Sequence, residues 1–246
     1  MFYGNFQDPE DRKFVMDAIE RFKKIFPSVY ASDNVILMNR ALVLRGDKKF
    51  NEAVERQAKN RQERSLFLRL NTLIWAAAEA IRIPGDFVEC GVWRGYCMAV
   101  VADYLDFKEV PKQFYLYDTF EGIPPEYDTE KHDAAPFHEE GLYESVVRRF
   151  ADYSNVKVVR GIVPDSFNEA APERVAFLHL DLNSSKGEIA ALEVLFDRMS
   201  PGGIIVFDDY GWLGYGAQQV AEDDFMRRRG HRILELPSGQ GLLIKH

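Results

Sequence analysis

The chain has 246 residues, 46% of them hydrophobic and 28% charged, which is the composition of a globular protein and excludes disorder as the overall state. Its 31 basic and 39 acidic residues give a net charge of -8, and we expect no nucleic-acid partner because phosphate binding depends on clustered Lys and Arg. No apolar run approaches the roughly 20 residues that cross a bilayer, and the first residues lack the basic and apolar regions of a signal peptide. We therefore expect a cytoplasmic protein with no membrane partner, whose cysteines, Cys90 and Cys97, stay reduced.

The first 80 residues are expected to be mainly helical, with helices over residues 9–26, 49–62 and 65–81. Asp8 and Pro9 form the pattern of a helix cap followed by a proline in the first turn. The third segment is rich in Leu and Ala, which predicts a buried helix with Trp75 in the core. We expect a helical extension over residues 1–64 and a second domain over residues 65–246.

From residue 85 onward, short apolar runs alternate with longer amphipathic stretches. The apolar runs predict strands at residues 86–90, 113–118, 156–159, 175–181 and 203–208. The stretches between them predict helices at about residues 95–106, 141–152, 186–198 and 215–229. Such alternation predicts an α/β fold with a Rossmann-like, doubly wound parallel sheet. Residues 232–236 and 242–245 are joined by a short turn only, so this last pair must be antiparallel.

Acidic residues stand at or next to the ends of four of the five predicted parallel strands. They are Glu89, Asp118, Asp181 and the pair Asp208-Asp209. The carboxyl ends of parallel strands lie at one edge of the sheet, where ligands bind in open α/β folds. A single acid at a strand end can be an ordinary polar edge residue, but four together favour a functional site.

The turn after the first of these strands holds Gly91 and Gly95 on either side of Trp93 and Arg94, so it is not a G-x-G-x-x-G motif. It is either a tight turn for helix packing or a turn that lets a nucleotide-like ligand approach the backbone. Asp118, at the end of the next strand, suits the hydroxyl groups of a ribose.

A second candidate site lies where Asp181 meets Asp208 and Asp209. Three carboxylates suit Mg²⁺ or Ca²⁺ better than zinc, because hard cations prefer oxygen ligands. The alternative is that Asp209 only begins the turn before Tyr210.

Several segments together resemble a known family. Residues 84–95, Pro-Gly-Asp-Phe-Val-Glu-Cys-Gly-Val-Trp-Arg-Gly, are similar to the first motif of the macrocin/mycinamicin sugar O-methyltransferases, which include the novobiocin-sugar enzymes. Further resemblances lie at residues 69–73, 118–124, 181–183, 200–203 and 207–210. The resemblance runs from about residue 65 to the end of the sequence.

This resemblance implies the class I methyltransferase fold, a seven-stranded sheet whose last strand is antiparallel. It also implies that the enzyme depends on S-adenosylmethionine. It implies methyl transfer to a hydroxyl of a small molecule, usually a sugar of a glycosylated natural product, with bound Mg²⁺ and a homodimeric enzyme. The cofactor residues that it implies are Glu89, Gly91, Trp93, Arg94, Asp118, Thr119, Phe120, Gly161, Asp165, Ser166 and Asp181. The metal ligands that it implies are Asp181, Asp208 and Asp209.

One position departs from the family. Where relatives have Asp-x-Asp, this chain has Asp181-Leu182-Asn183, and the second acid is the favoured general base of the relatives. An amide cannot accept a proton at neutral pH, although its oxygen can bind metal or substrate. Either another group accepts the proton, or the metal ion contributes more to the reaction, or the acceptor is not the one that the relatives use.

The candidates for another base are Asp209, His138 and His179. His138 lies in the long acidic segment 126–140, which is either a lid over the acceptor or an ordinary surface loop. His179 lies on the same strand face as Asp181, where a buried histidine that serves only the core is the more common case.

Two other functions remain open from the sequence. A degenerate partner subunit that binds S-adenosylmethionine without catalysis would explain Asn183. A nicotinamide-dependent dehydrogenase would have a similar parallel sheet. The absence of a G-x-G-x-x-G motif and the antiparallel pair of strands at the end of the sheet argue against this function.

Overall fold

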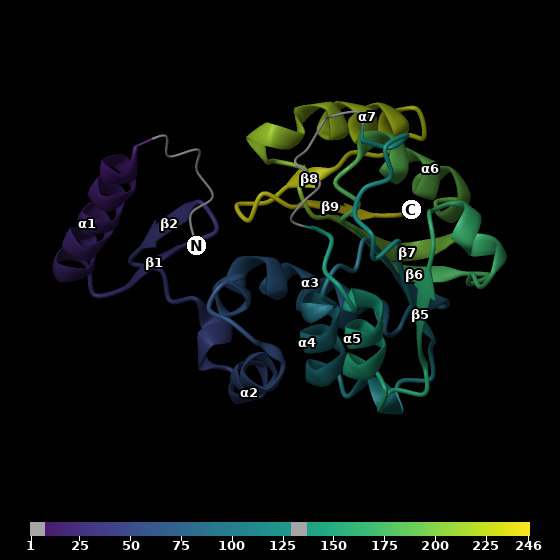
Figure 1. Ribbon diagram of the computed structural model, residues 1–246, viewed down its shortest axis with the longest axis horizontal. Helices are drawn as coiled ribbons and strands as arrows, with labels where there is room; N and C mark the ends of the chain where they lie inside the picture. Colours follow the sequence, from purple (N-terminus) through teal and green to yellow (C-terminus); the bar gives the residue numbers. More distant parts are fainter. Residues whose placement is uncertain (1–7, 129–136) are drawn as a thin grey trace. The chain divides into compact units, whose positions relative to one another are not determined.

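Figure 1 shows the computed structural model, which describes residues 8–128 and 137–246. The chain divides into two compact units, Met1–Leu68 and Arg69–His246, and each is described by itself. No helix within the described ranges is long and apolar enough to cross a membrane.

The first unit contains two helices and a β-hairpin: α1 (Pro9–Ile25), β1 (Val29–Ser32), β2 (Val35–Met38) and α2 (Lys48–Gln57), with short 3-10 turns at Val43–Gly46 and Glu63–Ser65. Asp8 caps α1 as predicted, because its side chain accepts a hydrogen bond from the Glu10 amide at 2.9 Å. The antiparallel hairpin was not predicted. Asp33 and Asn34 both adopt positive φ, the conformation of a two-residue hairpin turn that such residues favour.

Helix α3 (Phe67–Ala80) confirms the predicted Leu- and Ala-rich helix. Leu70, Leu73 and Ala77 are fully or almost fully buried. The expectation that Trp75 lies in the core was wrong, since its side chain is 47% exposed. The neighbouring apolar residues fill the buried face, and Trp75 falls on the opposite side of the helix.

The second unit is built on a seven-stranded sheet in the order β5-β4-β3-β6-β7-β9-β8. Its strands are β3 (Asp86–Cys90), β4 (Phe114–Asp118), β5 (Val156–Arg160), β6 (Val175–Leu180), β7 (Met199–Phe207), β8 (Leu234–Glu235) and β9 (Gly241–Ile244). β3 to β7 are parallel, whereas β9 is antiparallel to both β7 and β8. The doubly wound sheet with an antiparallel last strand is therefore confirmed.

Helices cover both faces of this sheet, as the alternation of strands and helices predicts. They are α4 (Tyr96–Tyr104), α5 (Leu142–Arg149), α6 (Ser185–Leu195) and α7 (Gly216–Arg227). In Figure 1, α4 and α5 lie on one side of the sheet with α3, and α6 and α7 lie together on the other. Every residue of β6 is buried, which is expected for a central strand covered on both faces.

Backbone hydrogen bonds hold the carboxyl ends of the parallel strands side by side. The Gly91 amide donates to the Tyr117 carbonyl at 2.9 Å, and the Asp181 amide donates to the Cys90 carbonyl at 2.8 Å. The Asp208 amide likewise donates to the Leu180 carbonyl at 2.9 Å. The predicted acids of β3, β4, β6 and β7 are thus brought to one edge of the sheet.

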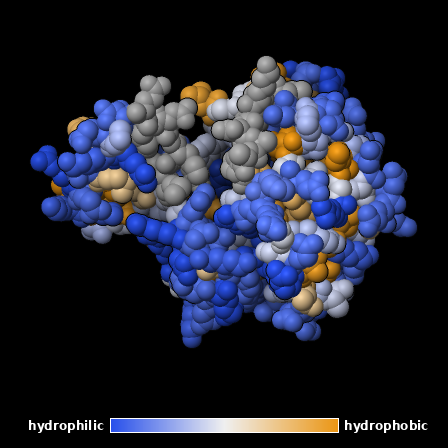
Figure 2. Space-filling view, viewed as in Figure 1, coloured by the Kyte–Doolittle hydropathy of each residue, from blue (hydrophilic) through white to orange (hydrophobic). Residues whose placement is uncertain are grey.

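Figure 2 shows that hydrophilic residues cover most of the face in view, with apolar side chains in scattered patches. Large apolar side chains that are more than a third exposed include Phe14, Met16, Ile25, Ile36, Met38 and Val43 in the first unit. In the second unit they include Trp75, Val147, Leu213, Val220, Leu234 and Ile244.

Candidate active site

The turns that follow three neighbouring strands each place a residue other than glycine in the left-handed region. Trp93 after β3 has φ 45°, Phe120 after β4 has φ 57° and Asn183 after β6 has φ 54°. This conformation is uncommon outside glycine, and residues with bulky side chains pay a conformational cost to adopt it. Such strain clusters at binding and catalytic sites, so the turns mark this edge of the sheet as functional.

Gly91 lets two chain segments cross at this edge. Its φ is 91°, and a Cβ atom built on it would overlap the backbone carbonyl of Asp181. The glycine is therefore required by the close approach of β3 and β6, whether or not a ligand also lies near it.

Asp118 fixes the turn after β3. Its Oδ2 accepts from the amides of Val92 and Trp93, both at 2.7 Å, and its Oδ1 accepts from the Phe120 amide at 2.6 Å. Each carboxylate oxygen has two lone pairs, so a ribose hydroxyl would have to share these oxygens with the amides. The ribose role of Asp118 stays a prediction, and its positioning of two turns is an additional role that the strand-end pattern did not indicate.

Glu89 is 3% exposed and is only half paired. Its Oε1 lies 2.9 Å from His179 Nδ1, whereas its Oε2 has no hydrogen-bond partner among the described residues. Burial, and then the charge of Asp118, raises the pKa of Glu89 well above its usual value. A buried carboxyl group with a bare oxygen fits an ammonium group, which the methionine end of S-adenosylmethionine carries. The residues present therefore fit this cofactor.

Trp93 and Ser166 add to that fit, because Trp93 Nε1 and Ser166 Oγ are also buried without a hydrogen-bond partner among the described residues. Ser166 lies beside Gly161, whose amide donates to the Asp118 carbonyl at 2.9 Å. Asp165, which the family resemblance also implies as a cofactor residue, is exposed.

Thr119 and Phe120 shape the turn after β4. Thr119 Oγ1 donates to the Gly122 carbonyl at 2.7 Å, and the Phe120 ring is buried against Tyr143 with 5.3 Å between centroids. Contact of either residue with an adenine stays a prediction.

The segment that contains His138 lies against the turn after β3. Arg94 Nε donates to Glu139 Oε1 at 2.8 Å, and the Phe137 ring packs edge-on against Trp93 with 6.1 Å between centroids. The His138 side chain is exposed, and no contact links it to Asp181 or Asp208 within the described part of the chain. Residues 129–136 of the predicted lid lie outside the described residues. The assignment of His138 as a base therefore stays a prediction without a supporting contact.

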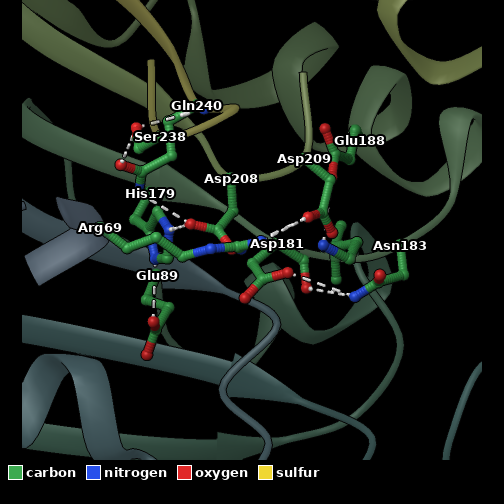
Figure 3. A network of polar contacts seen from close by, with 11 residues as sticks. Arg69, Glu89, His179, Asp181, Asn183, Glu188, Asp208, Asp209, Ser238 and Gln240 are labelled. Atoms are coloured by element: carbon green, nitrogen blue, oxygen red, sulfur yellow. Dashed lines mark hydrogen bonds and ion pairs between the residues drawn. The ribbon is translucent and has the colours of Figure 1, made fainter. Parts of the chain in front are cut away.

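Asp208 is the centre of a buried polar network at the ends of β6 and β7 (Figure 3). Its Oδ1 accepts from Gln240 Nε2 at 2.8 Å and lies 3.4 Å from His179 Nε2, and its Oδ2 pairs with Arg69 Nη1. Arg69 Nη2 also reaches Asp209 Oδ1 at 3.3 Å. The network was predicted only in part, because neither Arg69 nor Gln240 was identified as a site residue.

His179 connects the two halves of the site. Its two ring nitrogens face Glu89 and Asp208, and burial lowers the pKa of His179 to about 4, so the ring is neutral near pH 7. A neutral ring has one N–H, so it donates to one of these carboxyl groups while its other nitrogen faces the second. His179 is therefore buried, as expected, but it links Glu89 to Asp208 rather than serving only the core, and its lowered pKa makes it a poor candidate for the missing base.

Asp181, Asp208 and Asp209 form an oxygen-rich donor set of the kind that a hard cation prefers. One ligand atom each from His179, Asp181 and Asp208 lies within 4.8 Å of the others. Burial, and then the charge of Asp209, raises the pKa of Asp181 well above its usual value, as expected where acids lie close together. The residues therefore fit a divalent cation. Of the predicted ligands, Asp181 and Asp208 lie in this cluster. Asp209 is linked to Asp208 because both carboxylates pair with Arg69.

Asn183 lies next to this donor set, as the spacing predicts. Its Nδ2 donates to Asp181 Oδ1 at 3.2 Å. The left-handed backbone at this position is one that Asn and Asp tolerate better than most residues. Asn183 therefore orients Asp181 and cannot replace the base of its relatives.

Trp212 and Tyr215 follow β7 on the same side. The Arg69 guanidinium lies 4.9 Å from the centroid of the Trp212 ring. The pKa of Tyr215 is raised by burial and then by the charges of Asp209 and Asp181. A role of Trp212 and Tyr215 in lining an acceptor pocket stays a prediction.

A second pair of buried acids lies beneath the turn after β6. Glu188 and Glu222 are both fully buried, and Glu188 Oε1 accepts from the Leu182 amide at 3.1 Å. Burial, and then the charge of Glu222, raises the pKa of Glu188 well above its usual value, and burial raises the pKa of Glu222 to about 7. This pair was not predicted, because Glu188 lies in a helix whose other charged residues are exposed.

Glu222→Gln is expected to remove part of the pH dependence of stability. The folded-state pKa of about 7 lies above the ordinary 4.5, so raising the pH from 4.5 to 7 ionises this carboxyl more readily in the unfolded chain and lowers the free energy of unfolding. The variant should gain on the order of 1–3 kcal/mol relative to the parent between pH 5 and about 8. Urea unfolding at several pH values measures this, with the exposed Glu193→Gln as the control. Equal pH profiles for the parent and Glu222→Gln would contradict the expectation.

Comparison with known proteins now gives the family. The macrocin O-methyltransferase (TylF) family model matches residues 49–234. The 8-demethyl-8-(2,3-dimethoxy-alpha-L-rhamnosyl)-tetracenomycin-C 4'-O-methyltransferase of Streptomyces olivaceus is 32% identical over 182 residues, 67% of either chain. The mycinamicin III 3''-O-methyltransferase of Micromonospora griseorubida is 30% identical over 158 residues, 58% of this chain and 62% of the relative.

Solved structures agree on the fold. The O-methyltransferase NovP superposes with a TM-score of 0.62 at 21% identity, covering 73% of this chain and 80% of its own. The calicheamicin methyltransferase CalS11 also gives 0.62, at 18% identity, and covers 99% of both chains. The family match covers well over half of the sequence and includes the three turns and the acids Glu89, Asp118, Asp181, Asp208 and Asp209. The chain therefore belongs to the macrocin O-methyltransferase family, a family of methyltransferases.

Proposed function

We propose that this protein transfers a methyl group from S-adenosylmethionine to a hydroxyl of a small molecule, namely a sugar on a glycosylated natural product. The observation that carries the proposal is that, within the described part of the chain, Oε2 of the buried Glu89 is unpaired. The other oxygen of Glu89 contacts His179, and the second ring nitrogen of His179 faces Asp208, next to Asp181. One buried edge of the sheet thus offers an ammonium partner beside an oxygen-rich acceptor site. The names of the tetracenomycin and mycinamicin relatives, both sugar-directed enzymes of natural-product pathways, support the acceptor class.

The protein's task in such a reaction is alignment. The cofactor supplies an activated methyl group on a sulfonium. Glu89 would hold the ammonium end, with Gly91, Trp93 and Arg94 as the wall and Asp118 at the ribose. Holding the acceptor oxygen in line with the methyl group provides several kcal/mol of the barrier reduction.

We propose Mg²⁺ as an assisting ion, with Asp181, Asp208 and Asp209 as the residues that would hold it. When bound, such an ion acidifies and orients a hydroxyl group. Asp209 is the residue we favour to accept the proton, because it follows β7 directly before the segment with Trp212 and Tyr215, which we expect to line the acceptor pocket. The degenerate partner subunit is not favoured, since the acids of both halves of the site are present and mutually ordered.

Asn183 separates two versions of this mechanism. If the hydroxyl is acidified by the ion, Asn183→Ala should lower kcat only modestly, through a less ordered Asp181, and Asp209→Asn should lower it far more. If the base is missing instead, Asn183→Asp should raise turnover on a sugar hydroxyl by about tenfold or more, which is about 1.4 kcal/mol of barrier. Steady-state kinetics of the three variants on one glycoside distinguishes these outcomes.

We further propose a cytoplasmic homodimer. The first unit exposes large apolar side chains among its described residues, and a contact between two copies that covers them would remove them from water. Sedimentation velocity at two protein concentrations tests the dimer.

The cofactor is tested by titration calorimetry with S-adenosylhomocysteine and with NAD. We expect saturable binding of the first and none of the second. In Glu89→Gln the affinity for S-adenosylhomocysteine should fall, because the amide cannot ionise, as a carboxyl group can, beside the ammonium group. Tight binding of NAD, or none of either compound, would contradict the proposal.

A further inference from the structure

Arg69 neutralises two of the proposed metal ligands within the protein itself. Its guanidinium pairs with Asp208 Oδ2 through Nη1 and reaches Asp209 Oδ1 at 3.3 Å through both Nη1 and Nη2. The Arg69 side chain is 12% exposed, and those of Asp208 and Asp209 are 7% and 11% exposed. The ion pairs are therefore largely shielded from water (Figure 3).

The position of Arg69 is fixed from two sides. It projects from α3, whose neighbouring residues Leu70 and Leu73 anchor the helix in the core. Its guanidinium also lies 4.9 Å from the centroid of the Trp212 ring, a cation–π arrangement that favours a positive charge at this point. Arg69 is thus held between the acids and an aromatic ring.

A divalent cation and a guanidinium compete for the same carboxylates. Asp208 already accepts from Gln240 and faces His179, so its Oδ2 is the oxygen that Arg69 takes and a cation needs. Two positive charges on one buried carboxylate pair repel strongly because the surroundings screen them poorly. A cation can bind there only if the guanidinium withdraws from at least one acid.

We propose that Arg69 is the resident counter-cation of the acid cluster and sets its affinity for divalent metal. This inference rests on the metal role given under Proposed function. The ion is consequently held weakly and exchanges readily, and Arg69 keeps the acids paired when no ion is bound. Arg69 is in this sense a positioning residue for Asp208 and Asp209.

The test is direct binding of Mn²⁺, followed by electron paramagnetic resonance of the free ion. Arg69→Gln is expected to bind Mn²⁺ about tenfold more tightly or better, equivalent to about 1.4 kcal/mol. Arg69→Lys, which keeps the charge but loses the planar fork that spans two acids, should lie between this variant and the parent. Arg227→Gln, which removes an exposed arginine on α7, should match the parent.

A second readout is thermal stability. Without metal, the Tm of Arg69→Gln should lie below that of the parent, because two buried acids lose their partner, and Mn²⁺ should raise it more than it raises the parent's Tm. Adding Asp181→Asn to Arg69→Gln should abolish the gain in Mn²⁺ affinity, which shows that the gained site is this one.

Equal or weaker Mn²⁺ binding by both Arg69→Gln and Arg69→Lys would overturn the inference. If neither the parent nor the variants bind Mn²⁺ but all bind S-adenosylhomocysteine, the inference about Arg69 fails and the methyltransferase proposal stands. If the parent does not bind S-adenosylhomocysteine, the proposed function fails whatever Mn²⁺ does. A folded circular dichroism spectrum for each variant accompanies these measurements.

Discussion

Gly91→Ala is expected to abolish cofactor binding and to lower the free energy of unfolding by about 2–5 kcal/mol. The backbone at residue 91 has φ 91°, which favours glycine, and the added methyl group would overlap the Asp181 carbonyl. The overlap cannot be relieved by a side-chain rotation, because both partners are backbone atoms. The turn after β3 and the start of the turn after β6 must therefore move apart. Urea unfolding and calorimetry with S-adenosylhomocysteine measure the two effects.

Gly214→Ala is the matched control. No atom lies within 4 Å of a Cβ atom at residue 214, so this substitution should leave stability and binding within about 0.5 kcal/mol of the parent. If Gly91→Ala behaved like Gly214→Ala, the close crossing of β3 and β6 would not be the feature that orders this edge.

Asp208→Ala is expected to cost about 3–5 kcal/mol of stability and to lower kcat/KM at least as severely as any other single substitution in the site. The substitution leaves the Arg69 charge, the Gln240 amide and one nitrogen of His179 facing a site that no longer accepts their hydrogen bonds. Stranding a buried charge in this way is more costly than losing the ion pair itself. Chemical denaturation and steady-state kinetics measure the two losses.

Asp224→Ala provides the comparison for Asp208→Ala. Asp224 pairs with Arg227 and Arg228 on the surface of α7, where an ion pair contributes about 0–1 kcal/mol. A loss at Asp208 no greater than the loss at Asp224 would show that the network in Figure 3 contributes no more than a surface ion pair.

The strand-end acids could be predicted from the sequence because they depend on a local rule. Each follows a short apolar run, and parallel strands bring such positions to one edge. The antiparallel finish was predictable for the same reason, since a short turn permits no crossover. In both cases the signal lies within a few residues.

The partners of those acids could not be predicted, because they come from distant parts of the chain. Arg69 lies 139 residues before Asp208, in a mostly apolar helix whose other charged residue is Glu79. His179 meets Glu89 because of the pairing register of β3 and β6, which the pattern of apolar residues does not specify. Trp75 was misplaced because a Leu- and Ala-rich helix offers no contrast between its buried and exposed faces.

The Asp33-Asn34 hairpin is a different kind of miss. Its sequence does carry a turn signal, Asp-Asn between short apolar runs, but the helices expected over residues 9–26 and 49–62 left this segment without an assigned element. The Asp-Asn turn therefore forms a hairpin within a region whose other segments are mainly helical.

The most direct test of the central claim is mass spectrometry of acceptor products. The purified protein is incubated with S-adenosylmethionine, Mg²⁺ and a panel of rhamnosylated and other glycosides, and Glu89→Gln and Asp208→Ala serve as the inactive controls. We predict that at least one glycoside gains the mass of one CH₂ unit on its sugar, in step with the formation of S-adenosylhomocysteine, and that both variants fail to produce it. Methylation of catechols or other non-sugar hydroxyls, with the glycosides unmodified, would contradict the assignment of a sugar acceptor. Binding of S-adenosylmethionine without methylation of any hydroxyl acceptor would contradict the proposed catalysis.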